Sequence, residues 1–98
     1  ELKPSHAGSP GIAHGGVLMS LLDTAIGSYV LIEALSRGVS ASTVEMKTNM
    51  IRPAKIGTTL LTECQILSAG RTLIVAEGKV YEVGSQKLIA FGVGTFNL

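Results

Sequence analysis

The pattern of apolar and polar residues changes once along this chain, near Gly38. Before that point, the segment Val17–Leu35 is almost continuously apolar, as in a helix that other parts of a fold surround. We expect a helix from about Gly15 to Ser36, with Gly38 as a left-handed cap. A helix this apolar needs to be covered on most of its sides.

After Gly38, apolar and polar residues alternate with the period of two that is typical of strands. The expected strands are Ser42–Ile51, a segment around Leu60–Ile66, about Thr72–Val83 and about Lys87–Phe96. Arg52-Pro53 ends the first of them, because proline lacks the ladder N–H. The short turns between the later strands make neighbours antiparallel. Glycines inside these strands permit curvature or a close approach of the helix; they are Gly78, Gly92 and Gly94.

The N-terminal residues have a different composition. Pro4, Gly8, Pro10 and Gly11 mark residues 4–13 as a loop. The sequence has no internal repeat, low-complexity tract or second domain, so residues 1–98 are expected to form one α+β domain.

Charge and composition exclude several classes of function. A net charge of +1 and an aromatic content of 4% give no reason to expect nucleic acid as a partner. The single Cys64 cannot form an internal disulfide, and the first residues lack the pattern of a signal peptide. We therefore expect a cytoplasmic protein. A membrane span is not expected, because Asp23 and Glu33 lie within the apolar segment, at a cost of about 2.5–3.5 kcal/mol each near a span centre.

The candidate chemistry lies at the start of the helix. His14-Gly15-Gly16 is followed, nine residues after the histidine, by Asp23. An ionised carboxylate buried without a partner costs several kcal/mol, so packing alone does not explain Asp23. The glycines let a substrate approach backbone N–H groups that have no helical partner. The pattern predicts an oxyanion site beside an attacking group; a structural role for Asp23 and a loop-anchoring role for His14 are the alternatives.

The same helix carries small residues along one side. Ser20, Thr24 and Ser28 recur at every fourth position, with Asp23 and Gly27 beside them, so another backbone could come close. A chain of 98 residues cannot bury this much apolar surface by itself. We expect a homodimer in which edge strands pair into one continuous sheet, or a homotetramer built from two such dimers.

These motifs together are specific for a family. The run GIAHGGVLMSLLDTA, with RPAKIG thirty-odd residues later and a GRT turn at Gly70–Thr72, resembles the hotdog-fold acyl-CoA thioesterases of the PaaI-like, phenylacetate-pathway type. The resemblance extends from about His6 to Phe96. It implies a long central helix wrapped by a curved antiparallel sheet, with the family's first strand missing and Glu1–Ser5 at most its tail. It also implies hydrolysis of acyl-CoA without a metal or redox cofactor.

The resemblance assigns roles to individual residues. Asp23 corresponds to the catalytic carboxylate, which acts as a general base on water or as a nucleophile. Gly15 corresponds to the backbone N–H donor to the thioester oxygen, and His14 to the histidine that orients the loop or contacts the carbonyl. Thr43 stands where relatives often carry the hydroxyl that positions the water. In this fold the carboxylate usually serves a cleft shared with the partner subunit, so Thr43 is expected to act across the interface.

The chain departs from the family at one position. Relatives commonly have an asparagine six residues before the histidine, which contributes to the oxyanion site; here that residue is Gly8. The alternatives are slow turnover, a hydrogen bond from Ser9 or His6 instead, a different substrate, or no turnover, as in a non-catalytic acyl-CoA or lipid-binding hotdog module. If the missing donor limits turnover, Gly8→Asn is expected to raise kcat.

Basic residues suggest where coenzyme A binds. Arg52, Lys55 and Arg71 could form one patch for its phosphates, because arginine binds phosphate through two parallel hydrogen bonds. Gly16 is expected to contact the substrate through its backbone. The alternative for the three basic residues is an ordinary solvated surface.

Overall fold

The computed structural model describes residues 1–98, except for the side chain of Ser9. The elements in chain order are η1 (Pro4–His6), β1 (Ala7–Ser9), β2 (Ile12–Ala13), α1 (Gly15–Ser36), β3 (Ser42–Met50), β4 (Leu60–Ala69), β5 (Leu73–Glu82) and β6 (Leu88–Asn97). The expected helix is confirmed at both ends. Each of the four expected strands is present, with differences only at the ends of the strands.

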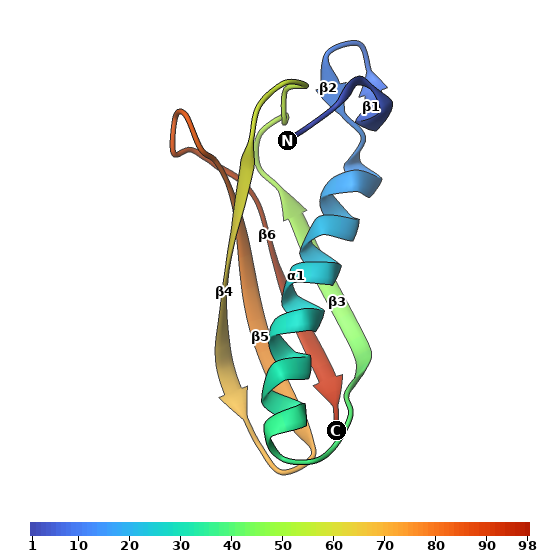
Figure 1. Ribbon diagram of the computed structural model, residues 1–98, viewed down its shortest axis with the longest axis vertical. Helices are drawn as coiled ribbons and strands as arrows, with labels where there is room; N and C mark the ends of the chain where they lie inside the picture. Colours follow the sequence, from blue (N-terminus) through green and yellow to red (C-terminus); the bar gives the residue numbers. More distant parts are fainter.

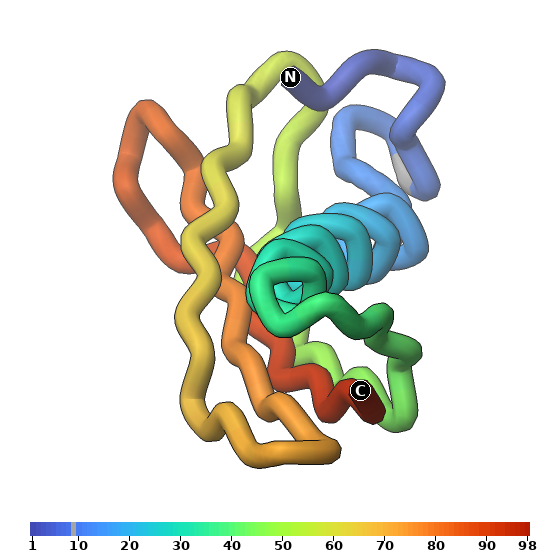
Figure 2. Tube along the Cα trace, turned by 60° about the horizontal axis from the view of Figure 1, so that its bottom comes forward, coloured from blue at the N-terminus to red at the C-terminus, as the bar shows by residue number. Residues whose placement is uncertain are grey.

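The four long strands form one antiparallel sheet in the order β3-β6-β5-β4. The sheet curves around α1, which lies along its concave face (Figures 1 and 2). This is the α+β arrangement that the sequence predicted, with one long helix against a curved antiparallel sheet. β3 and β4 are the two edges of the sheet, because β3 pairs with β6 and the connection between β3 and β4 crosses from one edge to the other.

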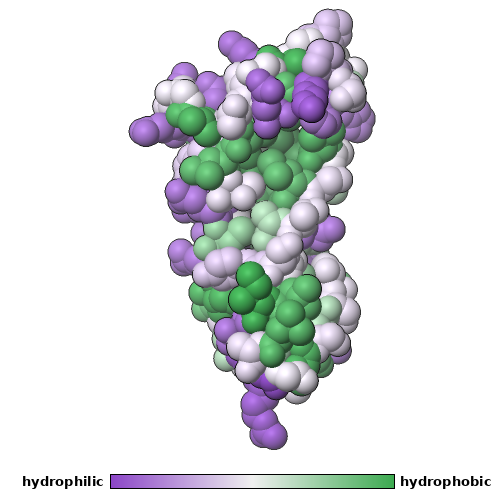
Figure 3. All heavy atoms as spheres, viewed as in Figure 1, coloured by the Kyte–Doolittle hydropathy of each residue, from purple (hydrophilic) through white to green (hydrophobic). Residues whose placement is uncertain are grey.

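The chain covers only one stripe of α1. The buried residues of the helix recur at every fourth position; they are Leu18, Leu22, Ile26, Val30 and Ala34. The prediction that the helix is covered on most sides is therefore wrong for a single chain. Large apolar side chains remain exposed on its other flanks, with Ile32 69% and Leu35 63% accessible. Apolar surface is broad on this face of the molecule (Figure 3). By length and composition alone, α1 also meets the criterion for a membrane-spanning helix.

Small residues let the helix approach the centre of the sheet. Cys64, Gly78 and Gly92 are paired across β4, β5 and β6. A Cβ added at Gly78 would lie 2.6 Å from Cγ1 of Ile26, so only glycine fits beneath the helix at this point. The prediction that strand glycines permit close helix approach is confirmed at Gly78. Cys64 packs against the same core, and burial raises the pKa of its thiol.

Gly78→Ala is expected to destabilise the fold by about 1–3 kcal/mol, because the added methyl group forces Ile26 or the helix to move. Urea denaturation monitored by circular dichroism measures the change. Gly84→Ala is the control: this turn glycine has no atom within 4 Å of an added Cβ, so its effect is expected within about 0.5 kcal/mol of zero. Equal stability of the two variants would contradict the packing argument.

The segment before the helix is more ordered than the expected loop over residues 4–13. It contains the turn η1 and a two-stranded hairpin of β1 and β2. The hairpin turn uses Gly11 at φ +76°, a backbone conformation that glycine adopts without strain. Among the described residues no strand precedes β1. In the segment before β1, Leu2 is buried, and its backbone exchanges hydrogen bonds with Gly57 and Thr58.

Candidate active site

His14 caps the N-terminus of α1. Its backbone is extended (φ −63°, ψ 141°), and its Nδ1 accepts a hydrogen bond from the Gly16 N–H at 2.8 Å. Its backbone N–H donates to the carbonyl oxygen of His6 at 2.8 Å, which ties the helix start to the turn η1. The histidine therefore orients this loop, which is one of the two roles that the resemblance implied.

The two glycines after His14 differ in what they offer a ligand. The Gly16 N–H is occupied by the His14 ring, so it is not available to a substrate in this arrangement. Within the described residues, the Gly15 N–H has no acceptor, as expected for the first residue of a helix. A Cβ added at Gly15 would meet no atom within 4 Å, so the space around it is open. Gly15 is thus the better placed of the two to bind an oxyanion.

Asp23 lies on an exposed flank of α1, not in the core. The expectation of a buried carboxylate is wrong for the single chain, because the sheet covers only the stripe through Leu22 and Ile26. Asp23 instead lines a groove of about 330 Å³ between α1 and β3, together with Met19, Ser20, Met46 and Thr48. A carboxylate that is accessible to solvent and lies beside Met19 and Met46 can attack, or activate water against, an acyl group bound in the groove.

The groove contains Thr48, not Thr43. Thr43 belongs to the other end of β3, five residues earlier, which corresponds to about 16 Å along a strand. In one chain Thr43 and Asp23 are therefore not brought together. Sequence reasoning missed Thr48, although its alternation with Met46 and Met50 places it on the helix-facing side of β3. A polar residue on an otherwise apolar strand face was the available signal.

Position 8 has no room for a side chain. A Cβ added at Gly8 would lie 2.9 Å from Cδ2 and 3.0 Å from Cα of His14. Gly8 also lacks the positive φ at which asparagine is tolerated. The expectation that Gly8→Asn simply adds an oxyanion donor is wrong, since the asparagine would first displace His14. Ser9 and His6 are the two residues expected to donate in place of the asparagine. The side chain of Ser9 lies outside the described residues, and the backbone of His6 is hydrogen-bonded to that of His14.

The three basic residues do not form one patch in the chain. Arg52 and Lys55 lie in the connection after β3, at the helix N-terminal end, where the Arg52 guanidinium donates to the carbonyl oxygen of Leu88 at 2.8 Å. Arg71 lies in the turn between β4 and β5, at the opposite end of the molecule (Figure 1). The ten residues of β4 separate the two ends by about 30 Å. The prediction of one patch made of all three residues is therefore wrong for the single chain, because Arg71 lies apart from Arg52 and Lys55.

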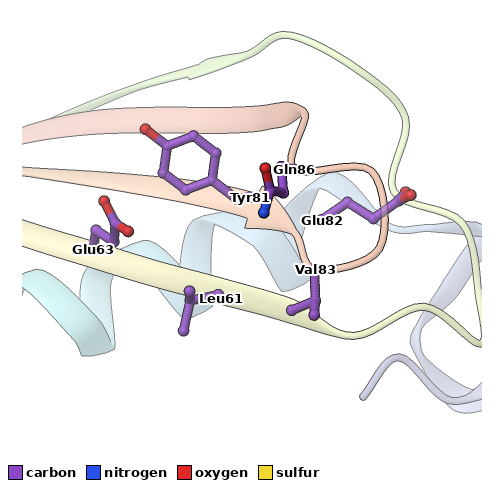
Figure 4. A pocket seen from close by; sticks show the side chains of 6 residues that line it. All are labelled: Leu61, Glu63, Tyr81, Glu82, Val83 and Gln86. Carbon is purple, nitrogen blue, oxygen red and sulfur yellow. The ribbon is translucent and has the colours of Figure 1, made fainter.

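Another hollow lies on the face of the sheet that points away from α1 (Figure 4). Its volume is about 410 Å³, and its lining residues are Leu61, Glu63, Tyr81, Glu82, Val83 and Gln86. None of the residues that the sequence predicted for the site lines this hollow. Among the described residues, no group of three His, Cys, Asp or Glu side chains is close enough to hold a metal ion.

Comparison with known sequences gives one family. Residues 10–89 match the model of the thioesterase superfamily. Over 98 residues the chain is 31% identical to acyl-coenzyme A thioesterase 13 of Mus musculus, and it covers 69% of that protein. Across the curated relatives it matches, the chain spans 55% to 69% of their length.

Comparison with solved structures agrees. A Bacillus halodurans protein solved with CoA superposes with a TM-score of 0.86 at 35% identity, over 98% of this chain and 62% of that one. The PaaI protein of Escherichia coli, from the phenylacetic acid degradation operon, superposes with a TM-score of 0.84 at 25% identity, over 98% and 66% of the two chains. The long helix and curved sheet are therefore those of the hotdog fold.

Proposed function

Because the chain belongs to the thioesterase superfamily, we propose that it hydrolyses an acyl-CoA thioester to a free carboxylic acid and coenzyme A. The observation that carries the proposal is the position of Asp23, exposed on the flank of α1 in a groove that Met19 and Met46 line together with Ser20 and Thr48. The CoA in the similar Bacillus halodurans protein supports the same class of substrate.

Two chemical routes fit a carboxylate in this position. In the first, Asp23 accepts a proton from water as the water oxygen attacks the thioester carbonyl; the C–S bond then breaks, and the thiolate of coenzyme A takes up the proton. In the second, Asp23 itself attacks the carbonyl and the C–S bond breaks, which releases the thiolate of coenzyme A. Water then hydrolyses the resulting anhydride to the free acid and the Asp23 carboxylate, and the thiolate takes up the proton that the water releases. Both routes place negative charge on the carbonyl oxygen, which the Gly15 N–H and the dipole of α1 stabilise.

Release of free thiol from a panel of acyl-CoA esters, followed with a chromogenic disulfide, tests this function. We expect turnover with at least one ester of small or medium acyl group. The second candidate, a non-catalytic acyl-CoA-binding module, is favoured by the absence of a side-chain donor at Gly8. It predicts saturable binding of the same esters with no thiol release above the uncatalysed rate.

The geometry favours a site made by two subunits. Gly15 and Asp23 are eight residues apart on one straight helix, which separates them by about 12 Å along its axis. At that separation, one thioester carbonyl cannot lie within about 3 Å of both the Gly15 N–H and the Asp23 carboxylate of the same chain. We therefore place Asp23 of one subunit against Gly15 of its partner, with Thr43 also acting across the interface.

Two surfaces of the chain are suited to a second copy. β3 is a sheet edge with a free row of backbone groups, and its outer residue Val44 is 62% accessible. On α1, the stripe containing Ser20, Thr24 and Ser28 is exposed, and a Cβ added at Gly27 would meet no atom within 4 Å. Pairing of two β3 strands would continue the sheet across a homodimer, and the remaining apolar face of α1 would be covered in a tetramer.

Val44→Lys is expected to convert the dimer to monomers, because a lysine on each β3 edge brings like charges together where the strands would pair. Light scattering at micromolar concentration measures the mass, and turnover should fall with it. Leu67→Lys is the matched control, since Leu67 is a similarly exposed apolar residue on the opposite edge strand, β4. A wild-type protein with the mass of a single chain would contradict both the dimer and the shared site.

The remaining assignments rest on the same assembly. Arg52 and Lys55 lie beside the helix start, where they are positioned to contact the phosphates of coenzyme A. The exposed apolar face of α1 meets protein and not lipid, because Asp23 and Glu33 would each cost about 2.5–3.5 kcal/mol near the centre of a bilayer. The free Cys64 is compatible with the cytoplasm.

A further inference from the structure

We propose that His6 supplies the side-chain hydrogen bond to the thioester oxygen that an asparagine at position 8 provides in relatives. The inference rests on the proposed function. Within the chain, position 8 is closed to a side chain by His14. In an active enzyme, a side-chain donor at the oxyanion would then come from another residue of this loop.

His6 lies in the hollow at the start of the helix. This hollow has a volume of about 570 Å³, and its lining residues are Ser5, His6, Ala7, His14, Gly16, Val17 and Ser20. Ser20 also lines the groove of Asp23, so the two spaces lie next to each other on the helix. A thioester held at the helix N-terminus, opposite Asp23 of the partner subunit, would lie beside the hollow that His6 and His14 line.

The hydrogen bonds of the His6 ring determine which nitrogen is the donor. Its Nδ1 accepts a hydrogen bond from the Lys3 backbone N–H at 2.9 Å. A neutral imidazole that accepts at Nδ1 carries its proton on Nε2. His6 therefore presents an Nε2–H donor, which is the kind of group that the missing asparagine amide would have supplied.

The backbone around His6 holds the ring in place before a substrate binds. Pro4 occupies the first position of η1, and the His6 N–H donates to the Lys3 carbonyl oxygen at 2.8 Å. The His6 carbonyl oxygen accepts the His14 N–H, also at 2.8 Å. His6 is half-buried, and the hydrogen bond from the Lys3 N–H to Nδ1 orients its ring. A donor fixed in this way stabilises a developing charge without a cost of reorganisation.

Two substitutions separate the donor role of His6 from its role in the turn. In His6→Asn, the amide oxygen can replace Nδ1 as acceptor for the Lys3 N–H, but no donor reaches the position of Nε2. In His6→Gln, the amide N–H reaches about the position of Nε2, but the acceptor at Nδ1 is lost. We expect His6→Asn to lower kcat by about 10²-fold with little change in KM or Tm. His6→Gln should retain more turnover despite a lower Tm.

The proposal requires kcat of His6→Gln to exceed that of His6→Asn by at least tenfold. The reverse ranking would mean that His6 acts only through the turn, and equal values would mean that it has no donor role; both overturn the proposal. Wild-type turnover that Asp23→Asn abolishes establishes the function independently of this ranking.

A binding measurement keeps the proposal testable without turnover. The probe is an acyl-CoA analogue in which a methylene group replaces the thioester sulfur, so the carbonyl oxygen is kept and hydrolysis is blocked. We expect His6→Asn to weaken its Kd by about three- to tenfold relative to His6→Gln. Equal Kd values in the two variants would overturn the proposal.

Discussion

Replacing Asp23 with asparagine is expected to lower kcat for acyl-CoA hydrolysis by about 10²–10⁴-fold or more while the fold is kept. The amide has nearly the same shape as the carboxylate but cannot accept a proton or attack a carbonyl. Among the described residues Asp23 has no hydrogen bond or ion pair, so the substitution removes no interaction of the folded chain. Thiol release measures the effect, and circular dichroism confirms the fold.

Glu33→Gln is the matched control for Asp23→Asn. Glu33 is a carboxylate on the same helix, ten residues further on, where it pairs with Arg37 at 3.1 Å. Its exposed ion pair is expected to contribute little to stability, and kcat should be unchanged. An Asp23→Asn variant with wild-type kcat would remove Asp23 from the chemistry, and an unfolded variant would assign it a structural role.

Gly15→Pro is expected to lower kcat by about 10²–10³-fold, because proline removes the N–H at the start of α1 that has no acceptor among the described residues and that we propose binds the oxyanion. The position tolerates proline well. Gly15 is the first residue of α1, where proline is favoured, and His14 before it is already extended at ψ 141°. No hydrogen bond within the described residues is lost with this N–H.

Gly15→Ala is the control, since alanine keeps the N–H and its Cβ would meet no atom within 4 Å. We expect its kcat to stay close to the wild-type value. If Gly15→Pro and Gly15→Ala lose turnover equally, catalysis depends on the free space near Gly15 and not on its N–H. If neither does, the oxyanion is bound elsewhere.

Mixing the two inactive variants tests the shared site directly. In a mixed dimer of Asp23→Asn and Gly15→Pro subunits, one site carries both substitutions and the other carries neither, if each site uses Asp23 and Gly15 from different subunits. Refolding equal amounts together should then recover about a quarter of wild-type turnover, because half of the dimers are mixed and each has one intact site. No recovery would place both residues of a site in the same chain.

The sequence by itself determined the local structure of this protein. The bounds of α1 follow from an apolar segment that begins after His14 and ends before Gly38, because capping involves only neighbouring residues. The strands follow from the alternation of apolar and polar residues, which is likewise a pattern of residues close together in the sequence. The spacing of His14 and Asp23, together with the RPAKIG segment and the GRT turn, was also sufficient to indicate the family, since such motifs are read directly along the chain.

Only the tertiary structure decided which of these residues meet. The order β3-β6-β5-β4 joins segments far apart in the chain, and no local pattern specifies it. It places β3 beside α1, so Asp23 lies exposed next to Thr48. The length of β4 separates Arg71 from Lys55, and the hairpin of β1 and β2 brings Gly8 against His14. The burial of a side chain and the space around it depend on how the sheet curves around the helix. This curvature results from contacts between segments that are far apart in the sequence. Sequence patterns therefore indicated candidate residues for the site, and packing determined which of them lie together in one chain.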